Sequence, residues 1–302
     1  MGVLEGKVAI VTGGARGIGR GHALELAAEG ARVLVNDLGC TVDGEERSEA
    51  ADLTVDLIRS RGGTASADYE DVADFEGAGR MVQRAIDTYG RLDILVNNAG
   101  IARDAMIFNL GEDAWDAVIR VHLKGTYAPT HHAAKYWRSE FKAGRPVSGR
   151  VINTTSSAGI VGNVGQSNYA TAKAGLIGFT LTTSLELRRL GVTVNCISPT
   201  GSTRITATIP KPGFDVKEPD EYESFGRMDP SSAAPVVAWL ASDQAAHVTG
   251  QVFRVLGDTL ALVEPPSYGP TLENGQKRWT AEEAGERINV DIFRCKSPGL
   301  RY

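Results

Sequence analysis

Three side chains with the types and spacing needed for acid–base chemistry lie between residues 156 and 173. Tyr169 and Lys173 are four residues apart, so in a helix they share one face, one turn apart. Ser156 precedes Tyr169 by thirteen residues and follows a strand-like run at 150–154. An alcohol that loses hydride must also lose a proton to a nearby base. We therefore expect Tyr169 to be that acid–base group, Lys173 to assist it, and Ser156 to bind the substrate oxygen.

The pKa of Tyr169 decides whether its phenol can accept a proton. A free tyrosine titrates near 10, so a working pKa of about 7 requires roughly 4 kcal/mol of phenolate stabilisation. An ammonium about 4 Å away supplies on the order of 4 kcal/mol at an effective dielectric of 20. The spacing therefore predicts that Lys173 lowers the pKa of Tyr169. An isolated YxxxK pair is more often an ordinary helix-surface pair, so the prediction depends on the accompanying motifs.

A glycine-rich loop ends the first strand-like run. Residues 12–19 read TGGARGIG and lead directly into a helical pattern. Glycines here let the backbone turn tightly and approach a pyrophosphate, to which the helix N-terminus presents free N–H groups. A position between strand and helix favours a dinucleotide-binding loop over a structural turn, and the absence of GK[ST] excludes a P-loop NTPase. The residues expected to contact the cofactor are Gly13, Arg16, Gly17, Ile18 and Gly19.

The choice of dinucleotide depends on the end of the second strand-like run. Asp37 stands there, eighteen residues after Gly19. Its carboxylate can accept hydrogen bonds from the adenosine ribose hydroxyls and would repel a 2′-phosphate. Arg16 argues in the other direction, because a guanidinium can pair with that phosphate. We expect NAD, with NADP as the less favoured cofactor; the alternative for Asp37 is a solvated loop acid.

Short β-rich runs alternate with longer helical patterns along most of the chain. The strand-like runs are 7–11, 32–36, 64–68, 93–96, 150–154, 192–197 and 252–255. The clearest helical patterns are 19–29, 48–61, 112–141 and 169–190. Connections of this length permit crossovers between parallel strands. The pattern predicts the α/β class: a single Rossmann-type, doubly wound domain with a seven-stranded parallel sheet flanked by helices.

Two stretches interrupt this alternation. Residues 200–230 are rich in proline, glycine and charge, and we interpret them as a substrate-loop insert of a catalytic domain at 1–258. Residues 259–302 form a predicted C-terminal extension with a short helix at 280–287. The part of the insert from 211 to 229 holds three basic and six acidic residues. This net charge of −3 offers little help in binding a polyanionic coenzyme A.

Composition narrows the classes of protein further. The 302 residues are 42% hydrophobic and carry a net charge of −5, which argues against binding along a nucleic-acid backbone. Three widely spaced cysteines with no CxxC favour reduced thiols over a disulfide framework, and we expect no metal site. No run approaches the roughly 18 apolar residues of a membrane span. Because the start of the chain also lacks a signal-peptide pattern, we expect a cytoplasmic protein.

Together, TGGARGIG (12–19), NNAG (97–100), Ser156, YATAK (169–173) and PTG (199–201) resemble the short-chain dehydrogenase/reductase family over about residues 5–258. The resemblance implies that Lys173 also binds the nicotinamide ribose, and that homodimers or homotetramers form through the segments 112–141 and 169–190. It also implies adenine contacts from Asp71 and Val72, cofactor-lining contacts from Asn98, Ala99, Gly100 and Pro199, and nicotinamide carboxamide contacts from Ile197 and Thr203.

One position departs from the family pattern. In VHLKG (121–125), His122 stands where the family usually has an asparagine that completes a tetrad with Ser156, Tyr169 and Lys173. A histidine can support the same water-linked proton relay, and because it titrates near neutrality it would add pH dependence. The alternative is a packed helix histidine. The PTG spelling, where the family more often has PG, is a milder departure.

Motifs such as VNDLG (35–39) and NNAGIARD (97–104) resemble the dehydrogenase unit of multifunctional β-oxidation enzymes. They also resemble bacterial proteins that act on 3-hydroxyacyl thioesters or sterol-like alcohols. The leading hypothesis is thus an NAD(H)-dependent interconversion of a small-molecule secondary alcohol and ketone. The alternatives are an NADP-dependent 3-oxoacyl reductase, a catalytically idle NAD-binding sensor, and a nucleotide-sugar epimerase, for which little sequence remains to build a substrate domain.

Overall fold

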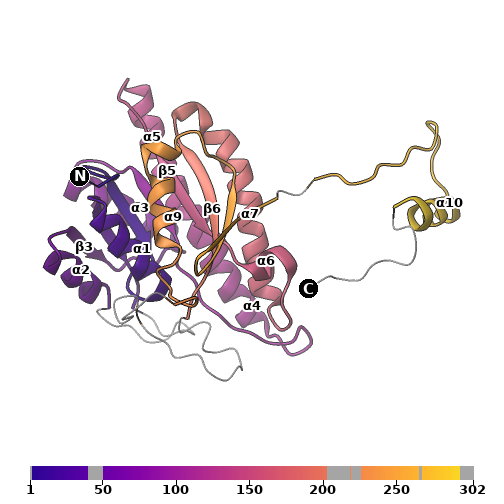
Figure 1. The fold of residues 1–302 in the computed structure, drawn as a ribbon, viewed down its shortest axis with the longest axis horizontal. Coiled ribbons are helices and arrows are strands. Elements are labelled where there is room, and N and C mark those ends of the chain that lie inside the picture. Colours follow the sequence, from indigo (N-terminus) through magenta and orange to yellow (C-terminus); the bar gives the residue numbers. More distant parts are fainter. Residues whose placement is uncertain (1, 40–49, 203–217, 219–225, 265–266, 293–302) are drawn as a thin grey trace. The chain divides into compact units, whose positions relative to one another are not determined.

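Eight strands form one sheet in the order β3-β2-β1-β4-β5-β6-β7-β8 (Figure 1). The computed structural model describes residues 2–39, 50–202, 218, 226–264 and 267–292. The strands are β1 Val8–Thr12, β2 Arg32–Asn36, β3 Thr64–Asp68, β4 Ile94–Asn97, β5 Arg150–Thr154, β6 Thr193–Thr200, β7 Val252–Leu256 and β8 Thr259–Val263. The seven predicted runs are the seven parallel strands, so the predicted α/β, doubly wound fold is confirmed.

The eighth strand was not predicted. β8 runs antiparallel to β7, with Leu256 paired to Thr259 across a two-residue turn. Gly257, the first turn residue, has a φ of +56°, a conformation that favours glycine and suits a tight hairpin. The Gly257-Asp258 pair between two apolar runs is therefore a hairpin signal that the sequence analysis overlooked. It places the first five residues of the expected extension in the sheet.

Helices cover both faces of the sheet. In the first compact unit the described helices are α1 Gly17–Ala28, α2 Ala50–Ser60, α3 Phe75–Tyr89, α4 Glu112–Ile119, α5 Gly125–Lys142, α6 Ser157–Val161, α7 Ser167–Leu187 and α9 Ala234–Ala241; α10 Ala281–Arg287 belongs to the second unit. A π-helical turn, Arg120–Lys124, joins α4 to α5, and short 3₁₀ turns follow α7 and α9. The predicted helix over 112–141 is thus interrupted at one turn, and π turns inside helices are frequent at functional sites.

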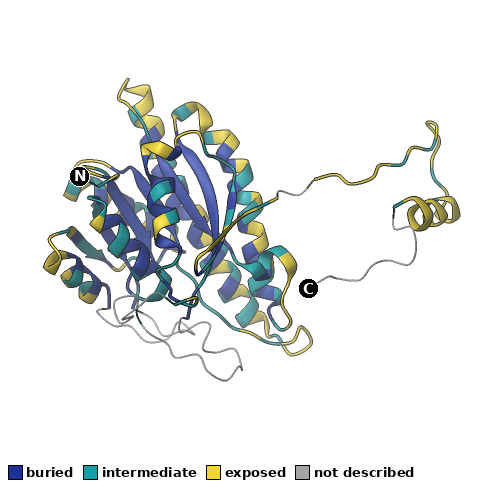
Figure 2. Cartoon of the chain, viewed as in Figure 1, coloured by how far each residue is buried: buried dark blue, intermediate teal, exposed yellow. Residues whose placement is uncertain are grey.

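Two apolar cores lie on opposite faces of the sheet (Figure 2). Successive strand residues point to opposite faces, so Ala9 and Val11 join the core under α1, α2 and α9. Val8 and Ile10 join the core under α3 and α5. Because both faces are covered, the central strands are buried along nearly their whole length, as parallel strands require.

The chain divides into two compact units, Met1–Val263 and Glu264–Tyr302. In the second, α10 begins after Thr280, whose hydroxyl accepts from the Glu283 backbone N–H while the Glu283 carboxylate accepts from Thr280. This reciprocal cap explains the short helix predicted there. None of the described helices has the length and apolar character needed to cross a membrane.

Candidate active site

Four side chains predicted to be catalytic converge at the carboxyl edge of the sheet. Ser156 follows β5 and caps α6, where its Oγ accepts from the Ala158 N–H at 3.2 Å. Tyr169 and Lys173 lie on α7, and Lys173 Nζ is 5.5 Å from the centre of the Tyr169 ring. His122 lies in the π turn and meets the Tyr169 ring edge-on, with 5.2 Å between ring centres. Strand end, helix and π turn thus bring together residues up to 51 positions apart.

The predicted lowering of the Tyr169 pKa is not found. Burial raises the pKa of Tyr169 to about 12; a hydrogen bond with Ser156 opposes the shift and the Asp104 carboxylate adds to it. The Lys173 ammonium lies over the ring and donates to the Thr154 carbonyl at 2.7 Å. The cost of burying a phenolate is the larger effect here and outweighs the attraction of the ammonium, on which the predicted lowering depends.

Lys173 itself is buried, with 3% of its surface exposed. Burial lowers the pKa of Lys173 to about 8, because an ammonium without water is costly. At pH 7 Lys173 is therefore still charged in most molecules. The Thr154 carbonyl, which was not predicted, fixes where that charge lies. The same strand supplies the Thr155 hydroxyl, which donates to the Lys173 carbonyl at 2.7 Å and ties α7 to the end of β5.

His122 does not titrate near neutrality, contrary to the expectation. Burial lowers the pKa of His122 to about 3, and the charge on Lys173 adds to the effect. Nε2 lies 2.8 Å from the Ile101 carbonyl and 3.3 Å from the Ile101 N–H, and the shorter contact favours the tautomer with its hydrogen on Nε2. Nδ1 is buried and has no hydrogen-bond partner among the described residues, and in this tautomer it is an acceptor. At Gly100, a Cβ would lie 2.4 Å from His122 Cε1, so this glycine makes room for the ring.

The glycine loop has the geometry of an anion cradle. Gly13 and Gly17 have φ values of +62° and +52°, which favour glycine. At Gly19 a Cβ would stand 1.9 Å from the Gly13 carbonyl, so no side chain fits there. The first turn of α1, which contains Ile18, presents its N–H groups at this point. The Gly17 N–H donates to the Glu218 carboxylate at 2.7 Å, which shows that an anionic oxygen is accepted there.

Asp37 lies next to this loop, at the end of β2. Its carboxylate accepts from the Ala15 N–H at 3.1 Å and from the Gly39 N–H at 2.8 Å. Two backbone donors hold the carboxylate beside the loop while leaving lone pairs free for further donors. Arg16 is the N-cap residue of α1, in an extended conformation. The loop and Asp37 therefore fit the pyrophosphate and the adenosine ribose of a dinucleotide.

The NNAG motif fastens the end of β4 to the same loop. The Thr12 hydroxyl accepts from the N–H groups of Asn98 and Ala99 at 3.0 and 3.1 Å. The Asn98 side chain donates to the carbonyls of Thr12 and Gly13. Asn97 donates across the sheet to Asn153 at 2.9 Å. The motif thus braces two neighbouring strands at the point where a cofactor would lie.

The remaining predicted cofactor residues are more dispersed. Val72 is buried, while the Asp71 carboxylate forms an ion pair with Arg120 of the π turn, a contact that was not predicted. Ile197 and Pro199 lie on β6, Ile197 fully buried. Thr203 lies outside the described residues. Among the described residues, no group of histidine, cysteine or acidic side chains could hold a metal ion.

Two contacts beside the site had no signal in the sequence. Gln166 donates to the Asp104 carboxylate at 2.6 Å, although 62 residues separate them. Glu218, from the 200–230 region, reaches Gly17 from 201 residues away. Gln166 lies at the N-terminus of α7 and Glu218 in the 200–230 region, and only the folded chain brings each of them to its partner.

Comparison with known proteins identifies the architecture. A family model described as short chain dehydrogenase matches residues 7–211. The hydroxyacyl-CoA dehydrogenase ChsB1 of Mycobacterium tuberculosis is 44% identical over 297 residues, covering 98% of this chain and 91% of that protein. A crystal structure of a short chain dehydrogenase from Mycobacterium avium superimposes with a TM-score of 0.87 at 46% identity, covering 100% of this chain and 99% of the other.

Two more relatives are named for different activities. The peroxisomal multifunctional enzyme type 2 of Drosophila melanogaster is 44% identical over 79% of this chain, which spans 37% of that enzyme. A 3-oxoacyl-[acyl-carrier-protein] reductase of Synechocystis is 39% identical over 85% of this chain and 98% of its own length. The matched model and these identities agree with the fold and the site motifs. The chain therefore belongs to the short chain dehydrogenase family of oxidoreductases.

Proposed function

We propose that this protein interconverts a secondary alcohol and a ketone with NAD(H), and that its substrates are 3-hydroxyacyl thioesters. The observation that carries the proposal is the convergence of Ser156, Tyr169 and buried Lys173 beside a glycine loop that accepts an anionic oxygen. Hydroxyacyl thioesters are favoured because a relative that is 44% identical over 98% of this chain is named a hydroxyacyl-CoA dehydrogenase.

The side chains divide the work as follows. A bound nicotinamide supplies the hydride acceptor. Ser156 Oγ accepts from the Ala158 N–H, and its hydroxyl hydrogen, which reaches Tyr169 in this structure, would turn to the oxygen of a bound substrate. Tyr169 accepts the proton of the alcohol, for which its pKa must fall from about 12, and the positive charges of Lys173 and of the oxidised nicotinamide both act in that direction.

His122 has a narrower part in this proposal. With the hydrogen on Nε2, as the short contact to the Ile101 carbonyl favours, Nδ1 offers a lone pair close to the Tyr169 ring. We assign Nδ1 the binding of a water that connects to Lys173 and returns protons to solvent. A pKa of about 3 keeps the ring neutral throughout, so His122 adds no pH dependence of its own near pH 7.

The proposed cofactor is NAD because the Asp37 carboxylate, held by two backbone donors, would repel a 2′-phosphate. The second candidate, an NADP-dependent 3-oxoacyl reductase, is favoured by the name of the Synechocystis relative and by Arg16 in the loop. The ratio of kcat/KM for the two cofactors separates them. We expect more than about tenfold preference for NAD, equal to roughly 1.4 kcal/mol.

The decisive experiment is Tyr169→Phe with a 3-hydroxyacyl thioester and NAD. Loss of an acid–base group costs about 10²- to 10⁴-fold in kcat, while NADH binding should persist. Tyr89→Phe, at the far end of α3, is the matched control and should keep full turnover. Wild-type turnover in the Tyr169 variant would refute the assignment. An absence of turnover by the unaltered protein on any alcohol would favour the idle sensor.

We further propose a homodimer or homotetramer built through α4–α5 and α7. These helices expose large apolar side chains in the first compact unit: Tyr127 and Phe141 on α5 and Leu185 on α7. Isolated exposed apolar residues are common, but three large ones on the helices expected at a subunit contact suit a protein interface. Sedimentation as a monomer at micromolar concentration would contradict this.

A further inference from the structure

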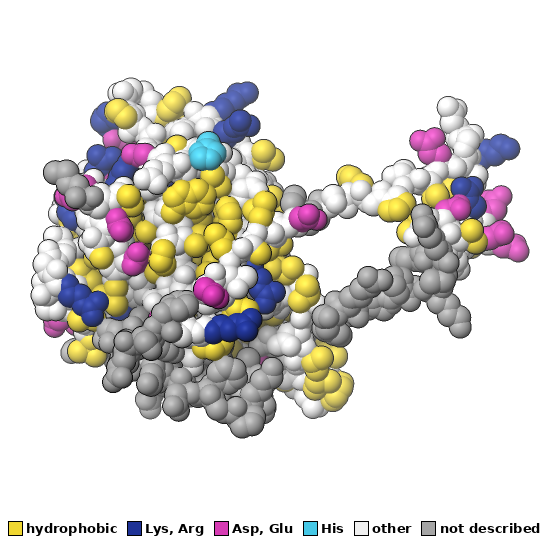
Figure 3. All heavy atoms as spheres, viewed as in Figure 1, with side chains coloured by type: hydrophobic (Ala, Val, Ile, Leu, Met, Phe, Trp, Pro, Cys, Tyr) yellow, Lys and Arg dark blue, Asp and Glu magenta, His cyan; other side chains and the backbone are white. Residues whose placement is uncertain are grey.

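Two loops beside the site expose an unusual set of apolar side chains. Met106, Ile107 and Phe108 follow β4, while Val161 and Val164 end α6 and begin the loop before α7. These five residues, here called the apolar rim, are between 42% and 75% exposed. Hydrophobic side chains project at the lower right of the main body in Figure 3, where these loops pass below α4 and α6 in Figure 1. Exposed apolar clusters of this kind usually mark a binding surface.

The two loops behave as one unit because polar contacts fasten them. The Ala105 N–H donates to the Gly165 carbonyl at 2.9 Å, and Ala105 pairs with Gln166 in a parallel bridge. The Gln166 side chain donates to the Asp104 carboxylate at 2.6 Å. These contacts hold the backbone on either side of the rim, so its apolar side chains are presented by a fixed scaffold.

Hydrogen bonds also connect the first of these loops to Tyr169. Asn168, which is fully buried, donates to the Arg103 carbonyl at 2.9 Å and accepts from the Tyr169 N–H at 2.7 Å. The rim is therefore connected to Tyr169 through a single buried side chain. Both loops leave the carboxyl ends of parallel strands, β4 and β5, which is the edge where such sheets bind ligands.

We propose that the apolar rim binds the aliphatic chain of the acyl substrate, and so makes the enzyme selective for longer chains. This inference rests on the proposed function and deepens it. None of the five rim side chains is charged, so the rim suits a hydrocarbon better than a phosphate or carboxylate. Each methylene buried against such a surface improves binding by about fourfold. The rim also leaves the coenzyme portion to be bound elsewhere.

The test compares chain lengths in the full-length protein. With 3-hydroxyacyl thioesters of about four to twelve carbons, kcat/KM of the unaltered enzyme should rise by up to about fourfold for each methylene that reaches the rim. Ile107→Ser with Phe108→Ser should lower kcat/KM for the longest chain by tenfold or more, with the shortest substrate changed less than twofold. Leu53→Ser, equally exposed on α2 at 65%, is the matched control and should change neither.

The outcomes separate the two proposals. If short thioesters are oxidised but the chain-length dependence is absent, or survives in the rim variant, the rim inference is overturned and the proposed function stands. If the variant changes the sedimentation coefficient instead, a second copy covers the rim and the inference is also overturned. If no thioester is oxidised, the proposed function fails. Calorimetry with saturated acyl thioesters then tests the rim, because binding that does not tighten with chain length overturns the rim inference. Val164→Thr, a smaller change, repeats the test should the double variant fail to fold.

Discussion

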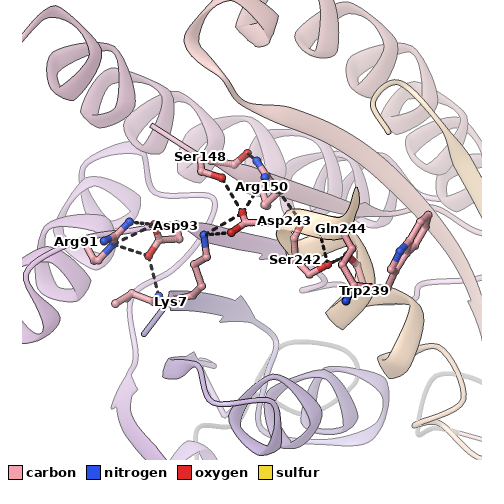
Figure 4. A network of polar contacts seen from close by, with 11 residues as sticks. Lys7, Arg91, Asp93, Ser148, Arg150, Trp239, Ser242, Asp243 and Gln244 are labelled. Carbon is pink, nitrogen blue, oxygen red and sulfur yellow. Dashed lines mark hydrogen bonds and ion pairs between the residues drawn. The ribbon is translucent and has the colours of Figure 1, made fainter. Parts of the chain in front are cut away.

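The two edges of one sheet differ in how fully their buried polar groups are paired. At the amino edge, charges before β1, β4 and β5 are paired with one another (Figure 4). The Asp243 carboxylate accepts from Lys7 at 3.1 Å and from Arg150 at 3.3 Å. In a second ion pair, two nitrogens of the Arg91 guanidinium donate to the Asp93 carboxylate. Asp93 also accepts from the Val8 N–H, which fixes the start of β1 beside β4.

At the carboxyl edge, polar atoms are left open. His122 Nδ1, Thr154 Oγ1 and Asn97 Oδ1 are buried and have no hydrogen-bond partner in the part of the chain that the structure describes, while Thr193 Oγ1 is such an atom at the amino edge. A buried polar atom without a partner costs about 1–3 kcal/mol, so such atoms persist where a ligand or water completes them. The difference indicates that the amino edge serves the stability of the fold, and that the carboxyl edge gives up stability for binding.

The largest expected effect that separates the edges is that of Lys173→Met. Turnover should fall by about 10²- to 10⁴-fold, since the ammonium supports the phenolate. Stability should hold or increase, because the variant no longer buries a charge. The folded pKa of about 8 lies below the ordinary 10.5, so folding of the unaltered protein becomes more favourable as pH rises from about 8 to 10.5. Thermal unfolding across that range should show this rise, and the variant should lack it.

Lys142→Met, exposed at the end of α5, is the matched control and should alter neither turnover nor the pH profile. A Lys173 variant that is strongly destabilised near pH 7 would break the comparison, because the site would then contribute to folding as the amino edge does.

The sequence predicted the elements that position the site better than it predicted the energies within it. Alternation of β-rich and helical runs placed seven strands within three residues at either end, because burial on both faces leaves a clear apolar signal. The motifs also named Ser156, Tyr169 and Lys173. The predicted shift in the pKa of Tyr169 was wrong in direction, because desolvation depends on what packs around the phenol after folding.

Contacts between isolated loop residues escaped prediction for a different reason. Nothing in the local sequence links Asp104 to Gln166, and their pairing follows from β4 and β5 being neighbours in the sheet. β8 was missed because its run was assigned to a tail, although Gly257-Asp258 carried a turn signal. Local patterns thus identify elements and motifs, while loop pairing requires the topology first.

Asp243→Asn tests the amino edge and should have an intermediate effect. Arg150 is 3% exposed and would lose its charged partner, but Asp243 is 69% exposed, so solvent screens the pair. We expect a loss of about 1–2 kcal/mol, or a melting temperature lower by a few degrees, with unchanged turnover. The hydrogen bond from Lys7 lowers the pKa of Asp243, so this stabilisation is present at neutral pH and is lost as pH falls below about 4.

Denaturant unfolding at two pH values checks this prediction. The gap in the free energy of unfolding between Asp243→Asn and the unaltered protein should be clear at pH 7 and should narrow as pH falls below the ordinary carboxyl pKa of 3.8. A variant that lost turnover while keeping its stability would reverse the roles assigned to the two edges.

The smallest expected effect concerns Glu218, whose carboxylate accepts from the Gly17 N–H where the pyrophosphate of a dinucleotide would bind. At a helix N-terminus a carboxylate gains about 0.3–1 kcal/mol, so a cofactor that displaces it binds more weakly by about two- to fivefold. Glu218→Gln should therefore tighten NADH binding by that factor, most visibly at low salt, with kcat at saturation unchanged. Fluorescence titration measures it, and Glu76→Gln, in the first turn of α3, is the matched control. Equal or weaker binding in the Glu218 variant would mean that this carboxylate does not compete with the cofactor for the Gly17 N–H. The loop would then be as available to a ligand as the unpartnered atoms elsewhere at the carboxyl edge.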